Sequence, residues 1–218
     1  MPDPAMLADV ARHMLPTTAV VGWADPRENY PLLAGEALPG AVPSRLREFA
    51  AGRHAARMAL NRIGAGLIAV PMADDRAPIW PVGITGTITH TRSACLAAVV
   101  RVGAFAGIGI DLEEDTPLDR DLWDDVLGPE EQLWLARQDG DRGGLSKRMF
   151  SAKEAAYKAQ YAQSRTVFGF DVIAIALTET RFTATFRQEI APFAEGYVIH
   201  GQHALVRGHI LTTSTLPA

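Results

Sequence analysis

Three acidic residues from two separate segments of the chain could together bind a divalent cation. Asp111 and Glu113 lie two positions apart, and Glu154 lies one helical turn before Lys158. On a strand, residues two apart project to the same face, so Asp111 and Glu113 would present two carboxylates together. A third carboxylate beside a lysine gives a set of oxygen ligands that suits octahedral Mg²⁺, an ion that usually accepts phosphate oxygens as well. The combination favours chemistry on a phosphate-bearing substrate.

Both parts of this set also have an ordinary explanation. The strand acids could be a solvated strand end that runs into Glu114 and Asp115. Glu154 and Lys158 could form a surface ion pair at i, i+4, which contributes only about 0.2–0.5 kcal/mol. From the residues alone, these alternatives stay open.

Basic residues recur where a phosphate-bearing ligand could use them. Arg45 would begin a helix, Arg53 and Arg57 share one face of it, Arg76 precedes a Pro-Ile-Trp-Pro segment, and His90 would end a strand. Taken singly, charged side chains are more often solvated surface groups, and a histidine at a turn is often satisfied locally. The five residues are therefore candidates for phosphate contacts.

Helices and a strand are needed to position these side chains. Residues 44–63 predict a helix, because Ser44 can cap it, apolar residues follow near helical spacing and Gly64 can end it. Residues 148–163 predict a longer helix that carries Glu154, and 129–135 a short one that begins with proline. Before Ser44, seven prolines predict only loops and short strands.

The other periodic segments predict strands. Asp111 and Glu113 would end one of them, with Ile110 and Leu112 directed into the core. The predicted strands cover residues 87–90, 94–100, 107–113, 172–177, 181–186, 197–200 and 209–213. A weak echo relates 51–56 to 151–156, displaced by about 100 positions, as in a duplicated half or a chance match of alanine-rich helices.

Composition excludes several classes of protein. The chain has 218 residues, 48% of them hydrophobic, and a formal net charge of −4, so a core is available and the whole surface has no electrostatic reason to coat nucleic acid. The longest apolar runs fall far short of the roughly 20 residues that a membrane span needs. The N-terminus lacks the order of a secretion signal, and the single Cys95 can form no internal disulfide. A globular protein of the reducing cytoplasm is expected, with Cys95 as a buried small side chain.

Three sequence blocks resemble one known family. Residues 76–90 resemble its basic-x-Pro-x-Trp-Pro segment followed by Ser/Thr-Ile-Ser/Thr-His, residues 109–113 resemble its Gly-Ile-Asp-x-Glu, and residues 150–158 resemble its aromatic-x-x-Lys-Glu-Ala/Ser-x-x-Lys helix. The family is the Sfp-type 4′-phosphopantetheinyl transferases, more closely their enterobactin-synthase component D-like (EntD-like) branch. Phe150 replaces the Trp of many members, and Thr89 replaces the commoner Ser before His90.

The resemblance implies a fold and an activity. The implied fold is α+β, with two similar halves, 1–106 and 107–218, related by a pseudo-twofold axis around a cleft for coenzyme A and Mg²⁺. The implied reaction moves the 4′-phosphopantetheine group of coenzyme A onto a serine of an acyl or peptidyl carrier protein and releases 3′,5′-ADP. A monomer is expected, because two halves in one chain would complete the cleft.

Site residues follow from the same resemblance. Asp111, Glu113 and Glu154 would hold Mg²⁺, with Glu154 also the general base and Lys158 assisting the departing 3′,5′-ADP. The candidates for gripping the nucleotide and its phosphates are Arg45, Arg53, Arg57, Arg76, Thr89, His90, Lys153 and Lys158. Carrier proteins are usually acidic, so Arg142, Lys147 and Arg148 are candidates for a basic docking surface.

Two other functions remain as alternatives. A Mg²⁺-dependent nucleotide or phosphodiester hydrolase could use the same acids with water as the nucleophile, although no P-loop or His-rich metal signature supports it. A non-catalytic coenzyme A or carrier-protein binding module would keep the basic residues but could lose the acids. The EntD-like character favours secondary metabolism, such as siderophore, polyketide or non-ribosomal peptide synthesis, without identifying the acceptor.

Overall fold

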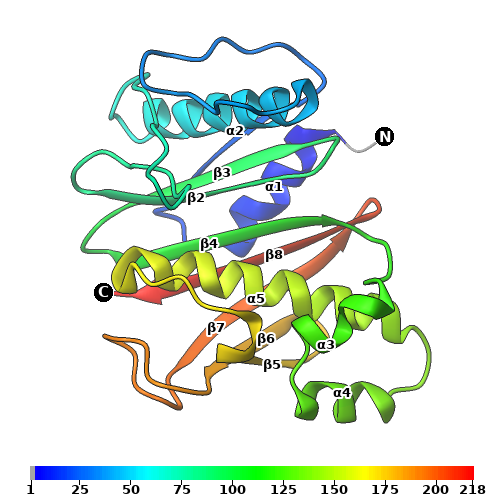
Figure 1. The fold of residues 1–218 in the computed structure, drawn as a ribbon. Helices are drawn as coiled ribbons and strands as arrows, with labels where there is room; N and C mark the ends of the chain where they lie inside the picture. The colour runs from blue at the N-terminus through cyan, green and yellow to red at the C-terminus, as the bar shows by residue number, and fades with distance from the viewer. Residues whose placement is uncertain (1–2) are drawn as a thin grey trace.

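The computed structural model describes residues 3–218 as two antiparallel sheets with helices packed on their faces (Figure 1). The elements in chain order are α1 (Pro4–Met14), β1 (Val20–Ala24), α2 (Pro43–Arg62), β2 (Ile84–His90), β3 (Cys95–Arg101), β4 (Phe105–Glu114), η1 (Arg120–Leu122), α3 (Trp123–Val126), α4 (Pro129–Ala136), α5 (Arg142–Ser164), η2 (Phe170–Val172), β5 (Ile173–Leu177), β6 (Arg181–Phe186), β7 (Val198–Val206) and β8 (His209–Pro217). This confirms the predicted α+β class.

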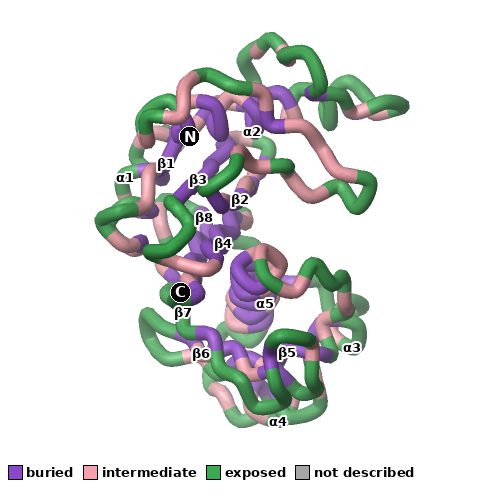
Figure 2. The backbone as a smooth tube through the Cα atoms, turned by 90° about the vertical axis from the view of Figure 1, so that its left-hand side faces the viewer, coloured by how far each residue is buried: buried purple, intermediate pink, exposed green. Residues whose placement is uncertain are grey.

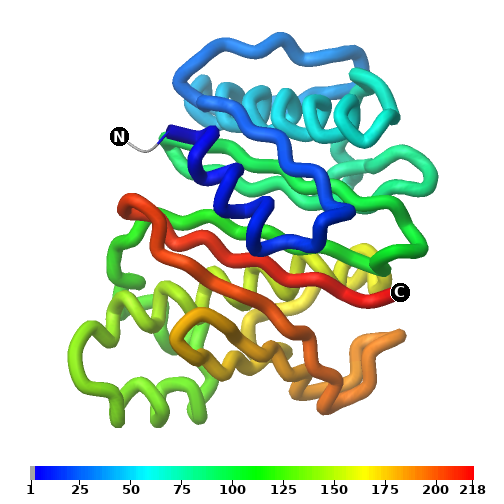
Figure 3. Tube along the Cα trace, turned by 180° about the vertical axis from the view of Figure 1, so that it is seen from behind, coloured from blue at the N-terminus to red at the C-terminus, as the bar shows by residue number. Residues whose placement is uncertain are grey.

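The smaller sheet has the strand order β1-β3-β2, and α2 packs on one of its faces. Alanines of α2, among them Ala51, Ala55 and Ala59, are fully buried against β3. On the other face, α1 covers β1 and β3 and reaches β8, as Figure 3 shows from behind. The N-terminal half is therefore a sheet between two helices.

The larger sheet has the order β4-β8-β7-β6-β5, and α5 packs along β4 and β8. Figure 2 shows α5 as a largely buried helix between the two parts of the molecule. Its buried face combines alanines with polar side chains such as Ser151, Lys153 and Gln160. A helix this polar is stable there only because each buried polar group can find a partner, so its contacts bear on function.

The two helices meet their sheets through matching close contacts. A Cβ added at Gly22 in β1 would lie 2.0 Å from Ala55 O of α2, and one added at Gly109 in β4 would lie 1.8 Å from Ala155 O of α5. In both cases the next helix turn, at Ala59 or Ala159, is also in contact. The helix positions differ by 100 residues, which supports the two similar halves that the sequence echo suggested.

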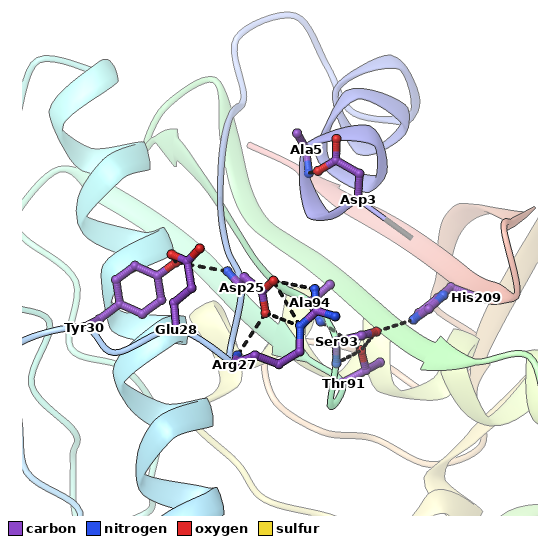
Figure 4. Close-up of polar contacts among 10 residues, drawn as sticks. All are labelled: Asp3, Ala5, Asp25, Arg27, Glu28, Tyr30, Thr91, Ser93, Ala94 and His209. Atoms are coloured by element: carbon purple, nitrogen blue, oxygen red, sulfur yellow. Dashed lines mark hydrogen bonds and ion pairs between the residues drawn. The ribbon is translucent and has the colours of Figure 1, made fainter. Parts of the chain in front are cut away.

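Side chains, not a strand ladder, join the two sheets where β2 meets β4. Thr87 Oγ1 accepts a hydrogen bond from Ile110 N at 3.3 Å, and Thr89 Oγ1 accepts one from Leu112 N at 3.0 Å. At the other end, Ser93 Oγ lies 3.0 Å from His209 Nε2 (Figure 4). These contacts fix the half that carries the acids relative to the half that carries the arginines.

Most predicted elements are confirmed, and one prediction was wrong. The segment before Ser44 contains the helix α1, which Asp3 caps and whose first residue is Pro4. Helix α5 begins at Arg142, six positions before its predicted start, because Asp141 caps it through Gly144 N. Strands β7 and β8 are longer than predicted and form a hairpin. Among residues 3–218, no helix has the length and apolar character to cross a membrane.

Candidate active site

Asp111 is the buried centre of the candidate site. It lies in β4 with 3% of its surface exposed, and Ile110 and Leu112 point into the core on the opposite side, as predicted. Its Oδ1 accepts hydrogen bonds from Lys158 Nζ at 2.7 Å and from Thr89 Oγ1 at 3.2 Å. Its Oδ2 accepts one from Ser151 Oγ at 2.8 Å. The carboxylate on β4 is thus held by groups from β2 and α5.

Glu113 lies two residues farther along β4 and has its own cation. Lys147, one of the predicted carrier-docking residues, places Nζ 2.5 Å from Glu113 Oε2 and 4.9 Å from the Phe150 ring centroid. Lys147 thus neutralises a carboxylate of the site, and only 15% of its side chain is exposed. This contact was not predicted, because nothing in the sequence links the two residues.

Glu154 and Lys158 share one face of α5, as their spacing predicted. The distance from Lys158 Nζ to Glu154 Oε2 is 3.9 Å, longer than the contact of the same ammonium with Asp111. In the described part of the chain Glu154 makes no other ion pair, and 29% of its side chain is exposed. The ordinary alternative, a surface pair at i, i+4, is therefore wrong for Lys158, whose main partner is a buried acid from another element.

The acids shift one another's ionisation. Burial and the charges of Asp111 and Glu113 raise the pKa of Glu154, against the opposing effect of Lys158. Burial and Asp111 likewise raise the pKa of Glu113, although Lys147 acts in the other direction. Burial alone would lower the pKa of Lys158, but Asp111 and Glu154 outweigh it, so this lysine stays charged. Three carboxylates face two ammonium groups, which leaves excess negative charge.

The acids do not form a ready metal cluster. Within the described residues, no group of three His, Cys, Asp or Glu side chains is arranged to hold a metal ion. Lysine ammonium groups lie beside Asp111 and Glu113 instead. The predicted metal ligands are therefore neighbours, but their oxygens do not converge on one point.

Four of the predicted phosphate-binding residues line one cavity in the N-terminal half. This arginine cavity has a volume of ≈ 500 Å³, within the range typical of ligand sites, and its lining includes Arg45, Arg53, Arg76 and His90. A second cavity of ≈ 460 Å³, the inter-half cavity, lies between the β2 side and α5 and is lined by Arg76 and Lys158, among others. Because Arg76 lines both cavities, they form neighbouring parts of one cationic cleft.

Arg53 is a buried cation that forms no ion pair with any residue between 3 and 218. Its surface is 5% exposed, its Nε has no hydrogen-bond partner, and its guanidinium lies 4.3 Å from the Phe49 ring centroid. Burial lowers the pKa of Arg53 to about 10, and the charge of Glu36 only partly opposes this effect. Buried charges are normally paired, so this one indicates an anionic ligand.

His90 is held in its neutral form beside Arg45. Arg45 Nη1 lies 2.9 Å from His90 Nε2, which must accept because a guanidinium only donates. Burial and Arg45 lower the pKa of His90, and Glu48 only partly opposes them. The same arginine donates to Glu48 Oε2 at 2.6 Å.

Three predicted binding residues have other partners. Arg57 is buried in an ion pair with Glu36 and donates to Pro31 O at 2.8 Å. Lys153 is buried and donates to Glu131 Oε2 at 2.8 Å and to Phe170 O at 2.9 Å. Thr89 contacts Asp111, not the arginine cavity. The structure brings none of the three to the arginine cavity, because Arg57 and Lys153 are paired with buried acids and Thr89 is bonded to Asp111.

The remaining docking candidates lie near the start of α5. Arg142 is exposed and donates from Nε to Gln138 O at 3.0 Å. Arg148 is half-buried, and its Nε has no partner. With Lys147 paired to Glu113, Arg142 is the only one of the three that is exposed.

Two residues that sequence reasoning missed belong to the site. Ser151 Oγ lies 2.8 Å from Thr212 Oγ1 as well as bonding to Asp111, and all three residues are buried. Ser151 lies inside the 150–158 block that resembles the family motif. A small polar side chain one helical turn before the buried Ala155 could have indicated a buried hydrogen bond. Thr212 had none, because its role depends on pairing with Asp111 across β4 and β8.

Comparison with protein families gives two matches. Residues 34–100 match the model of the 4′-phosphopantetheinyl transferase N-terminal domain, and residues 107–213 match that of the 4′-phosphopantetheinyl transferase superfamily. Together the two matches include Arg45, Arg53, Arg76, His90 and Lys158, the residues named above as lining the cationic cleft.

Individual proteins give a consistent result. The chain is 38% identical over 130 residues to 4′-phosphopantetheinyl transferase Npt of Nocardia iowensis, covering 60% of this chain and 58% of that protein. It is 29% identical over 199 residues to PptT of Mycobacterium tuberculosis, covering 87% and 85%. It is 36% identical over 127 residues to enterobactin synthase component D of Escherichia coli, covering 57% and 59%. The alignment thus spans less than two thirds of the Nocardia and Escherichia proteins.

Proposed function

The chain belongs to the 4′-phosphopantetheinyl transferase superfamily, and on this basis we propose that it transfers 4′-phosphopantetheine from coenzyme A to a serine of a carrier protein. The observation that carries the proposal is the cationic cleft between the halves, with Asp111, Glu113 and Glu154 beside Lys158 at one side of it. A cleft of this kind suits a ligand with several phosphates, such as coenzyme A.

The phosphates would be divided between the halves. Arg53, buried and without a counter-ion, and Arg45 would bind the most highly charged group, the 3′-phosphate. Arg76, which lines both cavities, would lie along the diphosphate, and Lys158 would lie near the leaving group. Each pairing uses the strength of charge-assisted hydrogen bonds in a partly buried site.

The chemistry of the donor set fits Mg²⁺, although the three carboxylates would have to turn away from their lysines to converge on the ion. Carboxylate oxygens are the ligands that this ion prefers, and three acids beside two lysines leave negative charge for it to neutralise. Glu154 is partly exposed, and its contact with Lys158 is 3.9 Å long, so its side chain can turn toward an ion. When bound by Asp111, Glu113 and Glu154, Mg²⁺ would supply charge stabilisation at the diphosphate.

The reaction would be a displacement at the β-phosphate. The carrier serine oxygen forms a bond to the β-phosphorus, the bond from that phosphorus to the bridging oxygen breaks, and 3′,5′-ADP leaves with the electron pair. Glu154 would accept the serine proton, because its raised pKa makes it a better base than an exposed carboxylate. Lys158, kept charged by Asp111, would stabilise the leaving group.

The biological setting remains a set of predictions. The similarity to a protein named enterobactin synthase component D supports a role in siderophore or related secondary metabolism. A cytoplasmic monomer and a basic docking surface that includes Arg142 are expected on the sequence arguments given above.

One mixture tests the function against its rivals. Purified protein, coenzyme A, Mg²⁺ and an apo carrier protein are combined and followed by mass spectrometry. A mass gain of one phosphopantetheine on the carrier supports the transferase. Release of 3′,5′-ADP without that gain would identify a hydrolase, and neither product would leave only a binding module.

Glu154→Gln tests the assigned base. The substitution removes a carboxylate charge and a proton acceptor while keeping the side chain's size, so we expect transfer to fall by at least about 10²-fold with the thermal unfolding temperature nearly unchanged. Turnover at the wild-type rate would contradict the role of Glu154.

A further inference from the structure

Ser151 and Thr212 form a hydroxyl relay that ends on Asp111. Ser151 Oγ donates to Asp111 Oδ2 at 2.8 Å, and Ser151 Oγ and Thr212 Oγ1 are 2.8 Å apart. A serine hydroxyl has one hydrogen, so once it donates to the carboxylate, Thr212 must donate to the serine. The chain of donors therefore runs from Thr212 through Ser151 to Asp111, and such chains strengthen each bond.

The relay follows from the packing of α5 on β4. Gly107 lies under Ala159 and Gly109 lies under Ala155, as the close Cβ approaches show. The next step is two residues along β4, from Gly109 to Asp111, and one turn along α5, from Ala155 to Ser151. This step places Asp111 under Ser151. Thr212 is the register partner of Asp111 on β8.

The N-terminal half contains the same three positions without polar groups. Gly22 lies under Ala55 as Gly109 lies under Ala155, so the equivalent of Asp111 is Ala24 and the equivalent of Ser151 is Ala51. Cys95 is the register partner of Ala24 and thus corresponds to Thr212. All three are fully buried in one apolar cluster.

This comparison separates packing from function. The helix-on-sheet contact is complete with alanine at the serine position, as Ala51 demonstrates. The hydroxyls of the C-terminal half are therefore needed only because an acid is buried there. Lys158 and Thr89 donate to Asp111 Oδ1, and Ser151 donates to Oδ2, so the relay holds the second oxygen and fixes the orientation of the carboxylate.

We propose that Ser151 and Thr212 are positioning residues, which fix Asp111 so that its Oδ1 remains directed toward Lys158 and the cleft. The inference rests on the proposed function, since it assigns Asp111 to the binding of a divalent cation. Neither residue contacts the substrate; both act through Asp111.

The test compares variants that lose a hydroxyl of the relay with a variant that loses a buried hydroxyl outside the relay. Ser151→Ala and Thr212→Val remove relay hydroxyls, and Thr212→Ser keeps the hydroxyl but loses a methyl group. Ser214→Ala is the matched control, because the buried Ser214 on β8 donates to Ala155 O of α5 at 2.8 Å and contacts no acid. Mn²⁺ binding without turnover is measured by electron paramagnetic resonance, and kcat and the KM for coenzyme A are measured with Mg²⁺.

We expect Ser151→Ala and Thr212→Val to weaken Mn²⁺ binding by about 10-fold and to lower kcat more than they change KM. Thr212→Ser should recover most of what Thr212→Val loses, and Ser214→Ala should bind Mn²⁺ as the wild type does. If Ser151→Ala does not fold, the Thr212 pair provides the same comparison.

One result would overturn the positioning role of the relay, and another would overturn the proposed function. If Ser151→Ala or Thr212→Val binds Mn²⁺ as Ser214→Ala does, the relay is only structural and the inference is overturned. If the wild type itself neither binds Mn²⁺ nor modifies a carrier protein, the proposed function fails, whatever the variants do.

Discussion

At the scale of single residues, two neighbouring arginines on α2 have opposite surroundings. Arg57 is paired with Glu36, whereas Arg53, one turn away, is equally buried and has no acidic partner. Burying a charge without a partner costs free energy that a bound anion can offset. The first is therefore assigned to stability and the second to ligand binding.

Arg53→Met should stabilise the free protein and weaken coenzyme A binding. Removing an unpaired buried cation is expected to raise the free energy of unfolding by about 1–3 kcal/mol, and losing a phosphate contact should raise the Kd for coenzyme A by about 10-fold or more. Thermal unfolding without ligand and isothermal titration calorimetry measure the two effects.

Arg57→Met is the matched control and should behave in the opposite way. It leaves Glu36 buried without its cation, which typically costs about 3–5 kcal/mol. A stabilised Arg57→Met, or an Arg53→Met variant that binds coenzyme A normally, would contradict this division of roles.

His90 should give the free protein a pH-dependent stability. Burial and Arg45 place its pKa below the unfolded value of about 6.5, with Glu48, Lys158 and Asp111 as the other charges that act on it. Because the unfolded state binds the proton more readily, stability is full above that value and is lost as the pH falls below it.

The comparison of wild type with His90→Gln isolates this contribution. Unfolding temperatures are measured between about pH 7.5 and 5.5, the range in which histidine titrates. The wild type should lose more stability than the variant toward acid, and a phosphate-bearing ligand should reduce the difference. Parallel curves for both proteins would rule out the assigned neutral state.

The shared faces of the candidate site residues were predictable from their spacing, but their partners were not. The spacing of Asp111 with Glu113 and of Glu154 with Lys158 predicted shared faces, and the structure places them so. Lys153 was predicted to contact phosphate, yet it bonds to Glu131, an acid 22 positions away on α4. Contacts of this kind depend on how helices pack, which residue type alone does not specify.

At the scale of elements, glycines set the distance between each helix and its sheet. Gly109 lets α5 approach β4 so closely that Ala155 O occupies the place of a Cβ. This approach also places Ser151 and Lys158 within reach of Asp111.

Gly109→Ala should therefore be severely destabilising. The obstacle is a backbone oxygen that cannot turn aside, so we expect a cost at or above about 3 kcal/mol and loss of any Mg²⁺-dependent activity. Gly40→Ala is the control, because Gly40 has a positive φ but nothing within 4 Å of the added Cβ, and should cost only about 1–2 kcal/mol. Urea unfolding measures the free energy of unfolding of both variants. Equal losses in the two would show that the close approach of α5 to β4 is unimportant for stability.

The missed helix α1 shows where sequence signals compete. Seven prolines before Ser44 predicted loops, yet Pro4 occupies the first helical turn, where proline is tolerated, and Asp3 caps the helix. Leu7, Ala8 and Ala11 then form a buried face. Counting prolines without their positions concealed a capped amphipathic helix.

At the scale of the whole molecule, the cleft exists because the halves meet without a continuous sheet. Strands β2 and β4 are joined by threonine hydroxyls, which replace the missing ladder while leaving room for the inter-half cavity. Neither half alone holds both the arginines and the acids. The arrangement could be anticipated only from the family resemblance, since the sequence echo between the helices says nothing about how halves are joined.

The roles of Thr87 and Thr89 should be distinguishable by experiment. Thr87→Val and Thr89→Val each leave one buried β4 amide without its acceptor, Ile110 N or Leu112 N, so each should cost about 1–3 kcal/mol and retain a single unfolding transition. Only Thr89 also donates to Asp111. Thr89→Val should therefore weaken Mn²⁺ binding several-fold beyond Thr87→Val, although their stabilities are similar.

Calorimetry and Mn²⁺ titration of the two variants distinguish a threonine that only connects β2 to β4 from one that also positions Asp111. Equal Mn²⁺ affinities would mean that Thr89 only connects the halves. Two separate unfolding transitions in either variant would mean that the halves are independent folding units, and the geometry of the cleft would then depend on its ligand more than on these hydroxyls. We expect a single unfolding transition for both variants and a lower Mn²⁺ affinity for Thr89→Val. This result would show that the Thr89 hydroxyl contributes both to the connection between the halves and to the site.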